Sequence, residues 1–471
     1  MASSVRRRVA GNTAVQVLGK GAVLAIGAAS IAILTRYLGP DDYGRFTLAL
    51  MYMQLFGVLA DVGLFTTVVR DISRDPERTD ELVGNALTLR LLLSFVVIAL
   101  AAGVSLLLPY APDVRVAILL AGGPLLFGML NTSLVAVFQA RLRMSRAVVS
   151  ETIGRAAGLG LVGLVAALDL GFYAVMGTAA AAALVTFAIT WGLSRQLVSA
   201  RFLADRRVWR ALLTASLPLG VALAVNELYF RADTLVISLF RDYDDVGLYT
   251  LAYRILELTI ALGTVFLTSV FPVISAYVAR ADERVNPAIQ EAWDAFLIAG
   301  IPLAAGGAIL APQIVDLAGG ADFDGSITPL RILLAAGALS WLNGVFGYAL
   351  IAKERQLNAL WLNLVGLAFN LGLNLALVPA YGIVAAAVIT LASELVILTG
   401  SYFLMRRHFG FFPTLRVLLP VVAAAALMAA ALWLLRDGSL AVLLPLGVVL
   451  YAGVLYAISP LSRRVVGAVL R

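Results

Sequence analysis

The sequence predicts an all-helical integral membrane protein with fourteen transmembrane helices. Hydrophobic residues make up 61% of its 471 residues and charged residues only 13%, whereas soluble domains are roughly 45–50% apolar. The mean hydropathy is +0.95. The charges fall in short clusters between apolar stretches that repeatedly reach the roughly 20 residues needed to span hydrocarbon. This alternation indicates many spans rather than a single anchor.

The apolar stretches follow one another along the whole chain. The first follows Arg6, Arg7 and Arg8, as a signal peptide would, but it is too long and a second span follows at once, so we expect it to remain uncleaved. The expected spans are 12–34, 43–67, 84–108, 114–139, 148–168, 171–194, 211–238, 246–273, 291–315, 328–352, 357–378, 382–405, 414–435 and 439–459.

Basic residues divide unequally between the two sets of alternate connections. With the N-terminus in the cytoplasm, 24 of the 35 Lys and Arg residues lie on the cytoplasmic side, 5 on the opposite side and 6 within helices. By the positive-inside rule both termini are predicted to be cytoplasmic. The protein itself is expected in the inner membrane of the cell. The basic residues flank apolar spans rather than covering one soluble face, so nucleic acid is not an expected partner.

The composition argues against enzyme chemistry. The chain has no cysteine, and its lone histidine, His408, lies in a basic turn. The sequence contains neither a Walker-type phosphate loop nor a nucleophile elbow. We therefore expect no catalytic residue, no metal site and no cofactor.

Two pairs of matching segments indicate an internal repeat. Residues 41–49 (DDYGRFTLA) and 244–252 (DDVGLYTLA) agree at six of nine positions, and 140–143 (ARLR) is echoed by 352–355 (AKER). We expect an N-terminal lobe in 1–200 with six helices, a C-terminal lobe in 201–407 with six more, and a helix pair in 408–471. An even number of helices per lobe makes the repeat parallel, which is one recognised plan of transporters, with the site between the halves.

Three short segments in this order carry a family resemblance. They are 36–44 (RYLGPDDYG), 231–233 (RAD) and 245–249 (DVGLY). Together with the helix count and the repeat, over about residues 8–405, the chain resembles the polysaccharide transporter (O-antigen flippase) family of the multidrug/oligosaccharidyl-lipid/polysaccharide exporter superfamily. The resemblance implies two lobes that open alternately to each side of the membrane and pass an undecaprenyl-diphosphate-linked oligosaccharide outward. It also implies a polysaccharide polymerase and glycosyltransferases as partners. The last two expected spans, 414–435 and 439–459, would supply an apolar groove for the lipid tail.

Charged residues inside the spans are the candidate site residues, because each costs about 2.5–3.5 kcal/mol at the bilayer centre unless it faces a partner or a wet cavity. Lys20, Arg231 and Arg254 are predicted to bind the diphosphate, since guanidinium groups in particular suit phosphate geometry. Glu227 lies one turn from Arg231 and can pair with it. The other residues predicted to line this lumen are Gln16, Gln54, Asn226, Glu227, Asp233, Thr250 and Glu257.

Directional transport without a nucleotide site requires an ion gradient or consumption of the product outside. Asp61 has no basic partner within one turn of its own helix. We predict it as the site of coupling to H+ or Na+, with helix–helix hydrogen bonding as the alternative. Arg90 is expected to have a structural role or to reach water from the inner end of its helix.

Other functions fit the same helix pattern. A drug extruder of the same superfamily should have an acid-dominated lumen, whereas six interior residues here are basic. A lipid II flippase shares the plan, but the sequence pattern with which that family usually begins is not found here. A membrane-embedded glycosyltransferase usually carries catalytic carboxylates in large external loops, and the external loops here are short. A scaffold without transport activity leaves the interior charges unexplained.

Overall fold

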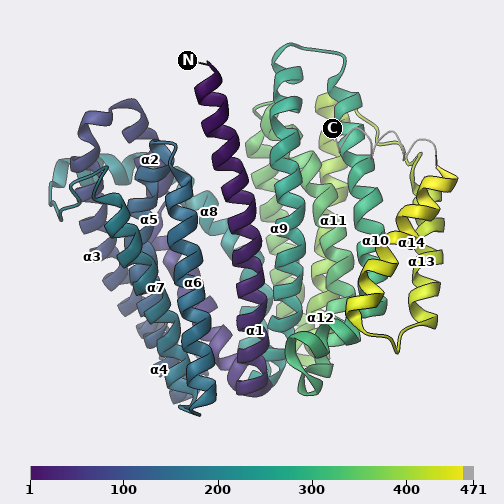
Figure 1. The fold of residues 1–471 in the computed structure, drawn as a ribbon, viewed down its shortest axis with the longest axis horizontal. Coiled ribbons are helices and arrows are strands. Elements are labelled where there is room, and N and C mark those ends of the chain that lie inside the picture. Colours follow the sequence, from purple (N-terminus) through teal and green to yellow (C-terminus); the bar gives the residue numbers. More distant parts are fainter. Residues whose placement is uncertain (1, 460–471) are drawn as a thin grey trace. The chain divides into compact units, whose positions relative to one another are not determined.

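The computed structural model describes residues 2–459, with side chains from residue 21 onward except residue 222. The described residues form helices and turns and no strand, which confirms the all-helical prediction (Figure 1). The helices are α1 (Ala2–Asp61), α2 (Leu64–Arg74), the 3-10 helix η1 (Pro76–Arg78), α3 (Thr79–Ser105), α4 (Pro112–Leu120), α5 (Gly122–Ala140), α6 (Met144–Ala167), α7 (Phe172–Ser194), α8 (Arg206–Phe240), α9 (Tyr243–Ala279), α10 (Val285–Gly319), the 3-10 helix η2 (Ala321–Ser326), α11 (Ile327–Ala352), α12 (Gln356–Phe409), α13 (Leu418–Leu434) and α14 (Leu440–Ile458).

Ten helical segments of the described chain are long and apolar enough to cross a membrane, and the bent α8 makes an eleventh. Two of the segments, Gly21–Arg74 and Gln356–Phe409, are 54 residues long. At 1.5 Å per residue this is far more than one crossing of a hydrocarbon core about 30 Å thick requires. The apolar α13 is shorter, at 17 residues. The protein is therefore a multi-pass membrane protein.

Some predicted boundaries differ from the structure. The expected span 43–67 is interrupted at Val62 and Gly63, which have φ of 45° and 76°. The expected span 114–139 is divided between α4 and α5. Pro124 explains the second break, because it has no N–H to donate to the carbonyl one turn earlier.

Each 54-residue segment changes direction at a glycine. Gly39 has φ 68° and Gly382 has φ 64°, a conformation that glycine adopts without the clash of a Cβ. Pro40 follows the first kink. Each kink falls between two of the predicted spans, at residues 34–43 and 378–382. Each long segment therefore consists of two helices that are joined at a glycine of non-helical backbone.

The chain divides into two compact units, one ending at Arg231 and the other beginning at Ala232. In the first unit, α1 packs against α3, α4 and α6, and α5 packs against α3 and α7. In the second unit, α11 packs against α9, α10 and α12, and α13 packs against α10 and α14. The division lies within α8, whereas the sequence places the lobe boundary at 200/201, which stays a prediction.

Equivalent turns of the two units are built alike. In the first unit, Tyr37 at the α1 kink accepts a hydrogen bond from Gly171 N at 2.8 Å and donates one to Asp169 Oδ1 at 3.0 Å. In the second unit, Arg241 after α8 lies 3.5 Å from the position of a Cβ at Gly382. In both cases the turn after the first expected span of a lobe contacts the turn before the last expected span of the same lobe.

The second echo of the repeat has the same backbone geometry in both units. Leu142 and Glu354 have φ of 53° and 58°, which is uncommon for residues with a side chain. The following amides donate to equivalent carbonyls, Arg143 N to Phe138 O at 2.7 Å and Arg355 N to Leu350 O at 2.8 Å. This shared helix end is what a duplicated sequence predicts.

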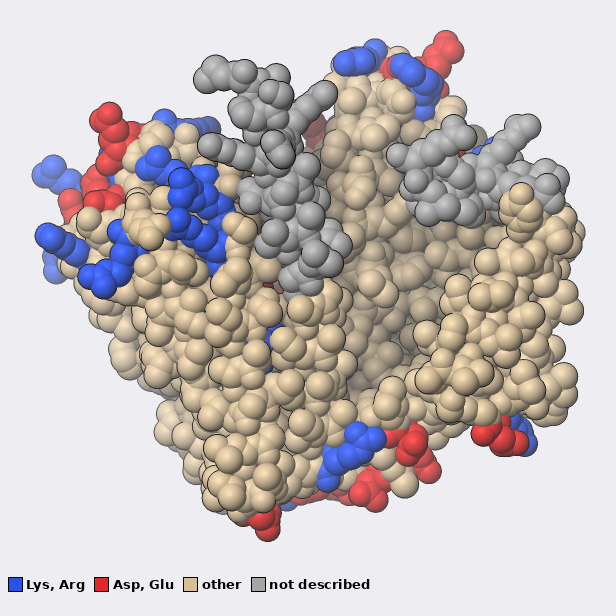
Figure 2. Space-filling view, in the orientation of Figure 1, with Lys and Arg blue, Asp and Glu red and all other residues tan. Residues whose placement is uncertain are grey.

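Charged side chains lie mainly at the ends of the helices. On the face drawn in Figure 2, Lys, Arg, Asp and Glu gather at the ends of each unit, and the sides between are apolar. Large apolar side chains are exposed on these sides, including Phe95 and Leu262 at 55% and 59%. Lipid rather than water is the natural solvent of such surfaces.

Aromatic side chains pack together within the core of the second unit. Trp341 of α11 packs on Phe296 with ring centroids 5.4 Å apart, and its Nε1 donates to Thr259 O at 3.0 Å. This approach requires a glycine on α9, because a Cβ at Gly263 would lie 2.2 Å from Trp341 Nε1.

Polar residues of α10 anchor the segment between α12 and α13. Asp294 is fully buried and forms an ion pair with Arg416 at 2.8 Å. Gln290 accepts from Thr414 N at 2.8 Å and donates to Thr414 O at 3.0 Å. Tyr451 of α14 donates to Ile298 O of α10 at 2.6 Å. The C-terminal helix pair is thus attached to the second unit through α10.

Candidate functional site

Arg254 lies on α9, a helix whose first turn carries Asp244 and Asp245. Its Nη1 is 2.7 Å from Glu257 Oε2, and the two side chains are 33% and 28% exposed. This ion pair takes one of the five N–H donors of the guanidinium. An arginine that is one-third exposed within a spanning helix retains the geometry to bind an anion.

Arg231 and Glu227 form the ion pair that their spacing predicts. Arg231 Nε is 3.2 Å from Glu227 Oε1, with exposed side-chain fractions of 12% and 23%. Both residues lie on α8 in the first unit, whereas Arg254 belongs to the second unit. A diphosphate site shared by the two arginines stays a prediction.

Most interior arginines are ion-paired within their own unit. The described pairs are Arg45–Asp41, Arg45–Asp113, Arg90–Asp61, Arg155–Glu151, Arg231–Glu227 and Arg254–Glu257. Lys20, the other predicted cation, and Gln16 lie outside the described side chains. Each of these five arginines therefore has a counter-charge, which lowers the cost of placing it in the membrane.

Asp233 joins three helices inside the second unit. Its side chain is 3% exposed. It accepts hydrogen bonds from Tyr249 of α9 and from Thr390 of α12, the latter at 3.3 Å. Thr250 is likewise buried, and its hydroxyl donates to Val246 O of its own helix at 2.5 Å. These two predicted lumen residues are held by helix contacts, whereas the predicted lumen residues Gln54 and Asn226 are exposed.

Asp61 has no basic partner within one turn of its own helix, and its counter-charge comes from another helix. Its Oδ1 forms an ion pair with Arg90 Nη2 from α3, and Arg90 Nη1 donates to Ser133 Oγ of α5 at 3.0 Å. Arg90 is fully buried, so it does not reach water as one alternative expected. The sequence of a single helix could not reveal this partner, because it comes from a helix 29 residues further along the chain.

A buried acid in the second unit escaped the sequence interpretation. Glu394 of α12 is 6% exposed, and Asn343 of α11 donates to its Oε2 at 2.6 Å. The signal was present in the sequence, because Glu394 is the single charged residue in the expected span 382–405. A charged residue in a span is a functional candidate by default.

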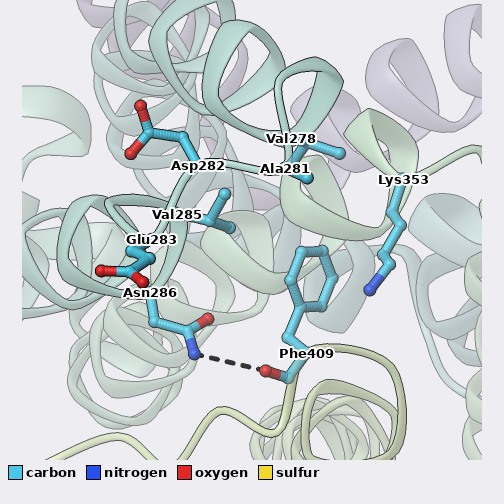
Figure 3. Close-up of a pocket in the computed structure, with 8 residues that line it drawn as sticks. All are labelled: Val278, Ala281, Asp282, Glu283, Val285, Asn286, Lys353 and Phe409. Atoms are coloured by element: carbon cyan, nitrogen blue, oxygen red, sulfur yellow. Dashed lines mark hydrogen bonds between the residues drawn. The ribbon is translucent and has the colours of Figure 1, made fainter.

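A pocket of about 290 Å³ lies where α9 and α10 meet the ends of α11 and α12 (Figure 3). Asn286 Nδ2 donates to Phe409 O at 3.2 Å across it. Lys353 Nζ lies 4.5 Å from the centroid of the Phe409 ring. The pocket lies beside basic turns at the helix ends, and the predicted site residues do not line it. No cluster of His, Asp or Glu able to hold a metal ion occurs among the described residues.

His408 lies beside this pocket. Asn358 Nδ2 is 2.8 Å from its Nε2. Burial, and then the charges of Arg355, Arg407 and Lys353, hold the pKa of His408 below its usual 6.5. The ring is therefore mainly neutral at pH 7 and can accept a hydrogen bond from Asn358.

Comparison with known proteins identifies family models and a relative that match large parts of the chain. The model of a family described as "Polysaccharide biosynthesis protein" matches residues 9–278, and the model described as "Lipid II flippase MurJ" matches residues 234–450. The probable low-salt glycan biosynthesis flippase Agl15 of Haloferax volcanii is 24% identical over 366 residues, which are 77% of this chain and 76% of that protein.

Solved structures of transporters share the fold. A lipid II flippase MurJ in an inward closed conformation has a TM-score of 0.77 at 13% identity, covering 93% of this chain and 98% of that one. An inward-facing multidrug resistance MATE family transporter of the MOP superfamily has a TM-score of 0.67 at 15% identity, covering 81% of this chain and 94% of that one. These relatives are flippases and transporters, not enzymes.

Proposed function

Because the chain belongs to the polysaccharide biosynthesis protein family, we propose that it is a flippase for a polyprenyl-diphosphate-linked oligosaccharide. It moves this lipid from the cytoplasmic to the outer leaflet for cell-surface polysaccharide assembly, by alternating access of two lobes. The similarity to a glycan flippase along three quarters of the chain and the MurJ-like fold support this proposal.

The partly exposed Arg254 on α9 is the observation that carries the proposal. A lipid-linked diphosphate is an anion that must pass a low-dielectric barrier. A guanidinium group can donate two parallel hydrogen bonds to it. Arg231 and Lys20 complete the proposed cationic site, and Glu227 and Glu257 orient the two arginines through their ion pairs.

The proposed topology has fourteen spans. Each kinked 54-residue segment crosses twice, α4 and α5 together cross once, and α13 with α14 forms the appended pair. Both termini are cytoplasmic because the basic turns collect on that side. The location is the cytoplasmic membrane, the helix pair offers a groove for an undecaprenyl-type tail, and a polymerase and glycosyltransferases are the expected partners.

Lipid II is the second candidate substrate. The MurJ family model covers residues 234–450, and MurJ has a TM-score of 0.77 to this chain. Both substrates carry a diphosphate on a polyprenyl tail and differ in the glycan. A transport assay that offers both lipids to the same vesicles distinguishes them.

The experiment measures flipping of a fluorescent polyprenyl-diphosphate sugar in proteoliposomes. Arg254→Ala should slow transport by roughly tenfold to hundredfold, because a hydrogen bond to a charged group contributes about 1.5–3 kcal/mol. Arg254→Lys, which retains the charge, should be milder.

Arg155 provides the matched control. It forms a similar one-turn ion pair with Glu151 in a spanning helix, at 3.1 Å and about half exposed. Arg155→Ala should leave transport near the native rate. Equal rates for Arg254→Ala and native protein, at equal abundance in the vesicles, would exclude the cationic site.

A further inference from the structure

The pocket beside the turn between α9 and α10 has no part in the proposed diphosphate site. Residues of this turn, among them Asp282 and Glu283, form one side of it, and Lys353 and Phe409 form the other (Figure 3). Its volume of about 290 Å³ lies at the lower end of the roughly 300–1,000 Å³ of pockets that hold drug-sized ligands. The space therefore fits a small polar group.

The internal repeat provides a comparison for this pocket. Residues 74–78 (RDPER) connect α2 to α3, and residues 280–284 (RADER) connect α9 to α10, with three of five positions identical. Arg141 and Lys353 likewise occupy the same position in the ARLR and AKER segments. Each unit thus contains an equivalent turn and an equivalent basic residue.

The equivalent basic residues make different contacts. In the first unit, Arg141 Nη2 donates to Pro76 O and to Thr79 Oγ1, both at 3.1 Å, and so binds the turn directly. In the second unit, the Lys353 ammonium donates to the His408 carbonyl and lies 4.5 Å from the centroid of the Phe409 ring. Lys353 therefore lies across the pocket from the turn, and the pocket is a feature in which the second unit differs from the repeat.

The pocket offers charges of both signs. Arg284 Nη2 donates to Asp282 Oδ2 at 2.7 Å, and this guanidinium lowers the pKa of Asp282 to about 2, so Asp282 is ionised and already paired. Glu283 is exposed and has no ion pair among the residues that the structure describes. Lys353 uses one of its three N–H donors on the His408 carbonyl. A carboxylate on one side and an ammonium group on the other are thus free for a ligand.

Such a pair of charges fits a small zwitterion, and the position of the pocket indicates which one. The pocket lies at helix ends, and the exposed apolar side chains of Val273 and Ile351 lie within two turns of it. Basic pockets between spanning helices at this depth bind lipid headgroups. We propose that the pocket binds the headgroup of phosphatidylethanolamine, with the phosphate at Lys353 and the primary ammonium at Glu283.

Glu283 determines the selectivity of this site among phospholipids. Phosphatidylglycerol has a net negative charge and no ammonium group, so the Glu283 carboxylate repels it. Phosphatidylcholine has a quaternary ammonium without an N–H donor, so it cannot form the charge-assisted hydrogen bond to the carboxylate. Lys353 contacts the phosphate that all three lipids share. The proposal concerns a lipid that the protein holds and does not depend on the proposed flippase function.

Native mass spectrometry of the purified full chain, titrated with each of the three lipids, measures their dissociation constants. Phosphatidylethanolamine should bind at least about tenfold more tightly than phosphatidylglycerol, because a hydrogen bond to a charged group is worth about that factor. Glu283→Gln should lose this preference, mainly through weaker binding of phosphatidylethanolamine. Lys353→Met should weaken the binding of all three lipids. Glu77→Gln changes the equivalent exposed acid of the first unit and should bind the lipids as native protein does.

Three results would overturn the proposal. Native protein could bind phosphatidylglycerol as tightly as phosphatidylethanolamine, which would make this region an ordinary basic surface for acidic lipids. Glu283→Gln could retain the native affinity and preference, or Glu77→Gln could lose them equally. If Lys353→Met does not fold, Glu283→Gln still decides the outcome, because its side chain is exposed and has no ion pair among the described residues.

Discussion

The buried ion pair between Asp61 and Arg90 provides the sharpest test of how the first unit is held together. Arg90 is 0% exposed and Asp61 is 21% exposed. Asp61 is the last residue of α1, and Arg90 lies within α3. Beside the break between α1 and α2, a Cβ at Gly63 would lie 3.0 Å from Ser216 O of α8. The pair therefore connects α1, α3 and, through Ser133, α5 at a point of close helix packing.

Removing one partner of the pair should lower the free energy of unfolding more than removing both partners. Asp61→Asn leaves the buried guanidinium without its counter-charge, and Arg90→Met leaves the carboxylate without its own. Breaking a buried pair in this way typically costs about 3–5 kcal/mol, whereas replacing both partners is often close to neutral. The double variant should therefore be more stable than either single variant.

Reversible unfolding in mixed micelles, followed by circular dichroism, measures the three free energies of unfolding. The expected coupling energy of the double-mutant cycle is at least about 2 kcal/mol, near the upper part of the range for residues in contact. Arg155→Met is the control, since its half-exposed pair with Glu151 should contribute less than about 1 kcal/mol. Additive effects of Asp61→Asn and Arg90→Met would refute the reasoning.

Three further predictions follow from the packing and the charges. Gly263→Ala should lower the free energy of unfolding by about 1–3 kcal/mol and change Trp341 fluorescence, because the new Cβ would meet the indole; Gly27→Ala, where a Cβ meets nothing within 4 Å, is its control. Asp294→Ala should increase hydrogen exchange in residues 411–417, and unchanged exchange would mean that the Arg416 ion pair does not anchor this segment. The nuclear magnetic resonance signal of the single histidine, His408, should titrate below pH 6.5. Because the folded chain binds this proton less tightly than the unfolded chain, the free energy of unfolding should fall as the pH drops below about 6.5. Titration of the signal at or above pH 6.5 would contradict this.

Hydropathy predicted the all-helical, multi-pass character of the fold correctly. The apolar stretches predicted the helices, and the ARLR and AKER segments predicted a repeat whose two copies share the rare φ at Leu142 and Glu354. These features are local, because a helix and a tight turn depend on residues within a few positions. Spacing along one helix likewise predicted the pairing of Arg231 with Glu227.

Contacts between helices could not be predicted in the same way. The partner of Asp61 lies on α3, and the partners of Asp233 lie on α9 and α12. A single sequence contains no record of which helix faces meet, so the environment of each buried charge remained open. Glu394 differs, because its isolation within an apolar span marked it as a candidate in the sequence itself.

The glycine kinks at Gly39 and Gly382 affect how the sidedness of the protein can be probed. At each, one glycine of non-helical backbone separates two helices, whereas proteases cut best at flexible loop tips. Cleavage at either kink would therefore report local unfolding rather than exposure on one side. Chemical labelling does not need such a loop. The chain has no cysteine, so a single cysteine replacing Tyr381, a side chain that is 71% exposed, could be modified by a membrane-impermeant thiol reagent on intact cells.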